Sequence, residues 1–329
     1  FASRFPLSPE LWEEWIQDRK GVGGEDAHEQ VLALYRHAFE DYQCAKLWPG
    51  YLETLEESLD EDDGAGVNTM REAFEEALGR VGVHPILGGA VWRAYLRFEK
   101  DELEDAEETG GDDVEISKAL ERRVEVKRLY RRQLSVPLVG NDEVLAEMGE
   151  AFEGDEDGLK EVCRLHAKAA DMLAVRMEHE QAVAKCQEKD PGGASTASAW
   201  EAYAAMEAAD GQPSRAVLVL ERAESEGCCL HERIWLMRSD LLLGGLSAKG
   251  PEATLTARAV RNLPWSSELW CRRLRSLERS YEEGSAEESS ESADGGAKAA
   301  GAATKAVRTA WRDALACALP SPDDYVKVT

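Results

Sequence analysis

The 329-residue sequence has few basic residues relative to its acidic ones: 39 lysines and arginines stand against 65 aspartates and glutamates, which gives a formal net charge of −26. A chain with this charge is repelled by phosphate backbones, so it is a poor candidate for binding nucleic acid by itself. Long apolar runs are also missing, because segments such as 216–220 and 241–243 fall well short of the roughly 18 residues of a membrane span. The sequence therefore indicates neither a general nucleic-acid-binding surface nor a membrane protein.

Motifs that carry chemistry are equally scarce. The seven cysteines are odd in number and form no CxxC pair, which favours reduced thiols over a disulfide framework or a zinc site. None of the six histidines belongs to an HExxH motif, and the sequence contains no GxxxxGK(S/T) phosphate loop and no GxSxG nucleophile elbow. We therefore predict a protein that is not an enzyme, with no metal site and no cofactor.

Tryptophan, in contrast, recurs at regular intervals. Three of the spacings, Trp12 to Trp48, Trp200 to Trp235 and Trp235 to Trp270, are 36, 35 and 35 residues. Apolar residues at i, i+3 and i+7 around each tryptophan predict a helix. Because the same positions recur in every unit, we predict that these rings form the core rather than a base-stacking platform. The signature positions are Trp12, Trp15, Trp48, Tyr51, Trp92, Tyr95, Trp200, Tyr203, Trp235 and Trp270.

A second helical segment follows each tryptophan helix, with arginine, an aromatic residue or leucine, and alanine in a shared order, as in 71–78 and 310–315. Strand-like alternation of polar and apolar residues is absent. The sequence therefore predicts an all-α protein, an α-α superhelix (solenoid) of about seven helix-turn-helix repeats that bury their apolar faces against their neighbours. The predicted repeats span approximately 8–43, 44–83, 87–138, 141–190, 195–228, 229–263 and 264–319, and an eighth begins at 320. An acidic, serine-rich insertion at about 283–296 is predicted to be disordered.

Two basic clusters are candidate partner-docking sites. The first consists of Arg122, Arg123, Lys127, Arg128, Arg131 and Arg132. It could dock an acidic protein segment or an RNA phosphate, but it could also neutralise the acidic run 99–115 just upstream, and we favour the second interpretation because opposite charges adjacent in sequence commonly pair. The second cluster includes Arg272, Arg273 and Arg275, and it is interpreted either as a partner site on the concave face or as a solvated helix face.

The repeat pattern resembles a known family. Trp-x-x-Tyr-x-x-Phe-Glu at 92–99 and Arg-x-x-Phe-Glu at 71–75 are similar to the half-a-TPR (HAT) repeat, which is found in RNA-processing scaffolds. The runs 5–12, 82–95, 130–138 and 259–265 resemble, in order, one HAT subfamily, the U4/U6 snRNP recycling factors also called squamous cell carcinoma antigen recognised by T cells.

This resemblance implies a nuclear, non-catalytic protein-interaction scaffold of a U6 snRNA-binding splicing factor that promotes U4/U6 reassembly. Its implied partners are snRNP and other RNA-processing proteins, ubiquitin-specific proteases or basic protein tails, while U6 snRNA is bound by RNA-recognition domains outside this segment. We expect the chain to be a monomeric fragment of a longer protein whose family dimerises through later repeats. The alternative is a HAT scaffold of another RNA-processing complex, in mRNA 3′-end cleavage, U1 snRNP assembly or rRNA processing.

Overall fold

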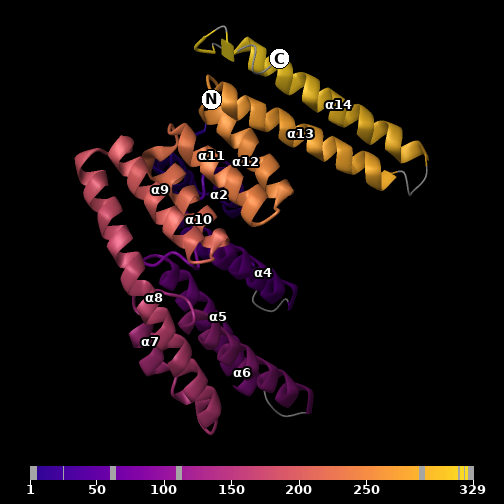
Figure 1. Cartoon of the computed structure of the whole chain (residues 1–329). Helices are drawn as coiled ribbons and strands as arrows, with labels where there is room; N and C mark the ends of the chain where they lie inside the picture. Colours follow the sequence, from indigo (N-terminus) through magenta and orange to yellow (C-terminus); the bar gives the residue numbers. More distant parts are fainter. Residues whose placement is uncertain are drawn as a thin grey trace. The chain divides into compact units, whose positions relative to one another are not determined.

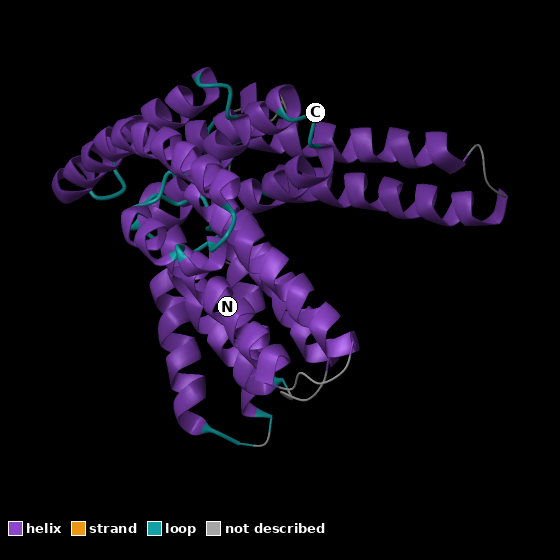
Figure 2. Cartoon of the chain, turned by 90° about the horizontal axis from the view of Figure 1, so that it is seen from below, coloured by secondary structure: helices purple, strands orange, loops and turns teal. Residues whose placement is uncertain are grey.

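The computed structural model describes residues 6–24, 26–59, 64–108, 113–288, 293–317, 319–321 and 323–324 (Figure 1). All regular secondary structure in these ranges is helical (Figure 2). The prediction of an all-α protein is confirmed. The chain forms two compact units, and each is described by itself: the N-terminal unit, Glu10–Ala182, and the C-terminal unit, which combines Val183–Thr329 with Phe1–Pro9.

The N-terminal unit contains helices of very different length. Its elements are α1 (Pro9–Val22), α2 (Ala27–Asp41), η1 (Ala45–Leu47), α3 (Trp48–Ser58), α4 (Gly64–Arg80), α5 (Gly88–Glu108), α6 (Asp113–Leu134), α7 (Asn141–Glu147), η2 (Glu150–Phe152) and most of α8 (Glu156–Lys189).

The C-terminal unit contains the end of α8 and the remaining helices. These are α9 (Ala194–Ala209), α10 (Pro213–Ala223), η3 (Glu224–Cys228), α11 (Glu232–Asp240), η4 (Leu241–Gly245), α12 (Lys249–Asn262), α13 (Ser267–Glu288) and α14 (Ala293–Ala316). Consecutive helices pack on each other, most extensively α9 on α10 and α13 on α14.

Aromatic rings fill the joints between consecutive helices of the N-terminal unit. The ring of Trp48, at the start of α3, stacks on Phe39 of α2 with 4.1 Å between centroids. Phe74 of α4 stacks in the same way on Tyr95 of α5, at 4.7 Å. Since buried aromatic side chains remove a large apolar area from water, each joint is stabilised where the recurrent aromatic positions lie.

Two tryptophans of the C-terminal unit make the same hydrogen bond to the turn that precedes their helix. Trp235 of α11 donates its indole N–H to the carbonyl oxygen of Cys229 at 2.8 Å. Trp270 of α13 donates to the carbonyl oxygen of Pro264 at 2.9 Å. In both cases the acceptor lies six residues before the tryptophan, in the turn that precedes the helix, so the polar edge of the buried ring is satisfied in the same way in successive helix pairs.

Trp15 departs from the predicted core role. The other signature residues are buried, whereas Trp15 is 45% exposed. Its neighbour Trp12 faces α2 and donates its indole N–H to the carboxylate of Asp41 at 3.0 Å. Trp15 stacks flat on Trp12, 5.3 Å away, and its outer face is left to solvent. In the other three aromatic pairs at this spacing both rings are buried, so the i, i+3 spacing alone does not predict that Trp15 is exposed.

The predicted acidic insertion needs a correction. We expected disorder over residues 283–296, but α13 continues to Glu288 and α14 begins at Ala293, while residues 289–292 lie outside the described part. Glutamate and alanine are good helix formers, and extending an existing helix costs far less than nucleating one. The low hydrophobicity of the insertion therefore did not prevent α13 and α14 from extending into it. Of the predicted eighth repeat, only residues 320, 321, 323 and 324 are described.

Candidate protein-docking surfaces

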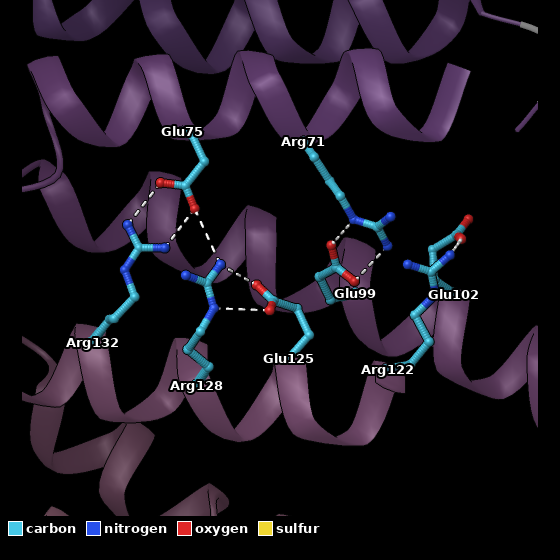
Figure 3. Close-up of polar contacts among 8 residues, drawn as sticks. All are labelled: Arg71, Glu75, Glu99, Glu102, Arg122, Glu125, Arg128 and Arg132. Carbon is cyan, nitrogen blue, oxygen red and sulfur yellow. Dashed lines mark hydrogen bonds and ion pairs between the residues drawn. The ribbon is translucent and has the colours of Figure 1, made fainter. Parts of the chain in front are cut away.

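The first basic cluster lies on α6, which packs against α5, while α5 in turn packs against α4. Figure 3 shows Arg128 and Arg132 beside Glu75 of α4, and Arg122 beside Glu102 of α5. Arg132 makes a bidentate pair with Glu75 of α4, with nitrogen to oxygen distances of 2.5 and 2.8 Å. The guanidinium of Arg132 also covers the ring of Trp92, 5.2 Å from its centroid. This residue of the cluster therefore joins three helices.

Three further cations of the cluster are also paired. Arg128 forms a bidentate pair with Glu125 on its own helix and lies 3.6 Å from Glu75. Arg122 lies 3.3 Å from Glu102, and Arg123 lies 2.7 Å from Glu107. Glu102 and Glu107 belong to α5 and to the acidic run upstream of the cluster, so part of the pairing follows the neutralisation that we favoured from the sequence.

Lys127 and Arg131 contact the segment that follows α6. Both lie near the carboxylate of Asp155, at 3.4 and 3.6 Å, and both cover the ring of Phe152 at 5.4 and 5.1 Å from its centroid. The backbone N–H of Gly158 and the Lys127 ammonium hold the pKa of Asp155 below its usual range. These two cations therefore fasten the start of α8 to α6.

Two carboxylates of α4 and α5 that pair with arginines differ in environment. Hydrogen bonds from Arg132 lower the pKa of Glu75. Deeper in the unit, Glu99 of α5 is fully buried and accepts both hydrogen bonds of a bidentate pair from Arg71 of α4 (Figure 3). Burial raises the pKa of Glu99, and Arg71 opposes this shift. Since a buried charge without a partner is costly, Arg71 and Glu99 hold α4 and α5 in one register.

The ionised form of Glu75 should stabilise the N-terminal unit. We expect Glu75→Gln to lower the free energy of unfolding by up to about 1 kcal/mol at pH 7, since the pair is partly exposed and screened by water. Its pKa is lowered on folding, so the contribution is present above the ordinary glutamate value of about 4.3 and is lost as pH falls through the folded value. Urea unfolding of both proteins at pH 7 and pH 3.5 measures this.

The matched control for this prediction is Glu76→Gln, because Glu76 neighbours Glu75 on α4, is exposed, and has no cation within 4 Å among the described residues. It should change stability by less than about 0.5 kcal/mol. A Glu75→Gln effect that is the same at both pH values would contradict the role of its ionisation.

The second basic cluster lies on α13, and its members have different surroundings. Arg272 pairs with Asp240 at 2.5 Å, near the end of α11. Arg273 donates a hydrogen bond to the carbonyl oxygen of Ala253 in α12, at 2.7 Å, and burial lowers its pKa. Arg275 is exposed. Two of the three predicted docking arginines therefore connect α13 to neighbouring helices.

A buried ionic network in the C-terminal unit was not predicted from the sequence. Arg238 of α11 is buried and lies 2.6 Å from Glu221 of α10 and 2.7 Å from Glu224, which are buried as well. Burial raises the pKa of Glu224 against the opposing charge of Arg238. Arg258 of α12 approaches Glu221 at 3.4 Å. The network thus links α10, α11 and α12. The only sequence signal was an arginine three residues after Trp235, a position that is aromatic after Trp12, Trp48, Trp92 and Trp200.

No group of three or more histidine, cysteine, aspartate or glutamate side chains in the described ranges is placed to hold a metal ion. None of the described helices combines the length and the apolar character needed to cross a lipid bilayer.

Helix pairs sealed by recurrent tryptophans define the chain as a helical-repeat protein. Residues 1–109 match the family model of the PRP39 N-terminal HAT repeat. The first third of the chain is therefore similar to HAT-repeat proteins.

The curated relatives are more specific. The chain is 32% identical over 278 residues to the mouse (Mus musculus) spliceosome associated factor 3, U4/U6 recycling protein, covering 84% of this chain and 26% of that protein. The human (Homo sapiens) protein of the same name is 31% identical over 277 residues, with the same coverage. Cleavage stimulation factor subunit 77 of Arabidopsis thaliana is 23% identical over 135 residues, 41% of this chain and 17% of that protein. The chain thus spans about a quarter of the length of the recycling proteins, and the resemblance predicted from its sequence is confirmed.

Proposed function

We propose that this chain is a non-catalytic protein-interaction scaffold of a nuclear, U6 snRNA-binding splicing factor that promotes reassembly of the U4/U6 snRNP. The observation that carries the proposal is the similarity, over 84% of the chain, to proteins named for U4/U6 recycling. We further propose that the seven consecutive pairs from α1–α2 to α13–α14 are seven HAT repeats. Arrays of such pairs present a large surface for docking, and a scaffold acts through this surface rather than through catalysis.

In this proposal, proteins bind to the array and U6 snRNA binds outside it. The net charge of −26 opposes binding of phosphate, and each cation of the α6 cluster already has a carboxylate within 4 Å. Partners would be snRNP and other RNA-processing proteins, ubiquitin-specific proteases or basic protein tails. Arg123, Arg128 and Arg275, the most exposed of the predicted docking residues, would contact them at the rim of an interface.

A HAT scaffold in mRNA 3′-end cleavage is the alternative function. The similarity to cleavage stimulation factor subunit 77 favours it, but that similarity covers less than half of the chain.

A binding experiment separates the two. Immobilised residues 1–329 are incubated with nuclear extract, and the retained proteins are quantified by mass spectrometry. We expect U4/U6 snRNP proteins to dominate over cleavage factors, and the reverse result would favour the alternative. In parallel, a gel shift with purified U6 snRNA should show weak binding or none. Tight, U6-specific binding by this chain would contradict the proposed division between protein-binding and RNA-binding regions.

A further inference from the structure

We propose that the exposed apolar side of the first half of α6 docks a basic amphipathic helix of a partner protein. This surface, named here the α6 apolar face, consists of Ile116, Leu120 and Val124, whose exposed fractions are 56%, 58% and 66%. The proposal deepens the scaffold function proposed above and rests on it, since it assigns one docking surface and the chemistry of its occupant.

The three side chains form one continuous stripe. Positions i, i+4 and i+8 of a helix lie on one face, and Ile116 to Val124 covers about 12 Å of helix length. Val126 and Leu129, which follow on a different face of α6, are buried. The stripe is therefore separate from the apolar face that packs inside the unit. Single exposed apolar residues are common on proteins, but three in helical register form a docking surface of the kind that receives a helix.

The second half of the same side of α6 is covered, and this explains why the first half is open. Lys127 and Arg131 continue the stripe, and they lie over Phe152 and beside Asp155. The covering elements are α7, with 7 residues, and η2, with 3. The corresponding first helix of the next pair, α9, has 16 residues. A short α7 thus covers only one end of α6, and a helix of a partner would complete the joint.

The charge around the α6 apolar face selects a basic partner. Residues 99–124 contain eleven acidic and four basic side chains. Glu104, Glu107, Glu108 and Glu121 are exposed. The two arginines closest in sequence to Val124 are paired, Arg122 with Glu102 and Arg123 with Glu107. The surplus charge next to the stripe is therefore negative, and lysine or arginine flanking the apolar residues of a partner helix would complement it.

The occupant that fits is an amphipathic helix with aliphatic residues at i, i+4 and i+8 and with lysine or arginine on both flanks. An acidic helix would meet like charge on both sides of the stripe. The contact is small for a protein interface, so we expect micromolar affinity that falls as salt rises.

A synthetic peptide tests this directly. The probe is a fluorescein-labelled helical peptide with leucine at three positions spaced by four residues and lysine on the flanks, titrated with the full 329-residue chain and followed by fluorescence anisotropy. We expect binding that weakens at least tenfold in Leu120→Asn and weakens also in Glu121→Lys. Val175→Asn, at an exposed valine of α8 outside the face, is the matched control and should leave the affinity unchanged.

Several outcomes would overturn the proposal. These are no binding of the lysine-flanked peptide at about 100 µM, equal binding of a glutamate-flanked peptide with the same leucines, and equal binding by Leu120→Asn. A concentration-dependent dimer of the chain that Leu120→Asn abolishes would assign the face to a second copy instead. Failure here is distinguishable from failure of the scaffold function, because an inert α6 apolar face would leave the snRNP proteins retained by the chain unchanged between wild type and Leu120→Asn.

Discussion

Replacing Arg238 with alanine is expected to lower the free energy of unfolding of the C-terminal unit by about 3–5 kcal/mol at pH 7. The substitution leaves Glu221 and Glu224 buried, close together and without the guanidinium that lies 2.6 and 2.7 Å from them. Two buried carboxylates that lose their shared cation must stay ionised at high cost or take up protons. Urea unfolding followed by tryptophan fluorescence measures the loss.

The pH dependence of the Arg238→Ala protein identifies the cause. Burial already raises the pKa of Glu224 in the intact protein, and removal of Arg238 should raise it further. A carboxyl whose pKa is higher in the folded state than in the unfolded state binds more protons when folded, so the penalty should shrink as pH falls from 7 to 5. Glu224→Gln in the Arg238→Ala background should recover part of the loss. A penalty below about 1 kcal/mol at pH 7 would contradict the role of the network.

Trp235→Ala is expected to destabilise the same unit by about 3–5 kcal/mol. The indole is fully buried at the joint of α10, α11 and α12, where it packs with Leu255 and Ala259. Its removal leaves a cavity and frees the carbonyl oxygen of Cys229 from its hydrogen bond. Because neighbouring helix pairs depend on each other in a repeat array, the loss should reduce the cooperativity of unfolding as well.

Two variants separate volume from hydrogen bonding at this joint. Trp235→Phe keeps much of the ring volume and removes only the N–H donor, so it should cost less than the alanine variant. Trp15→Ala, at the exposed tryptophan of α1, should change stability by less than about 1 kcal/mol. Equal losses for Trp15→Ala and Trp235→Ala would show that burial does not set the effect.

The helix pairs could be predicted because the signal repeats. Tryptophan at intervals of about 35 residues, with apolar residues at i, i+3 and i+7, identifies helices and their buried face in one pattern. The pattern is less informative within a turn of helix, as Trp12 and Trp15 show: both match, and only Trp12 is buried. The short length of α7 could not be predicted either, because the sequence of that region lacks the tryptophan that marks the first helix of the other repeats.

The partners of the charged residues could be predicted only in part. The run 99–115 supplies Glu102 and Glu107, as the neutralisation hypothesis expected. The carboxylates of Glu75 and Asp155, however, come from α4 and from the start of α8, and nothing in a single sequence connects them to α6. Ion pairs between helices depend on the rotation and offset of the packed pair, and these follow from side-chain volumes at the joint.

The bidentate pairs between helices have an evolutionary consequence. Arg132 and Glu75 are 57 positions apart, and Arg71 and Glu99 are 28 apart. Losing either member leaves the other without its counter-charge, most severely for the buried Glu99. Substitutions at these positions should therefore be inherited as coupled changes, in which descendants keep both residues or replace both. Such correlated substitution would distinguish charges retained for the architecture of the array from exposed charges, such as Glu121, that are free to drift with a partner.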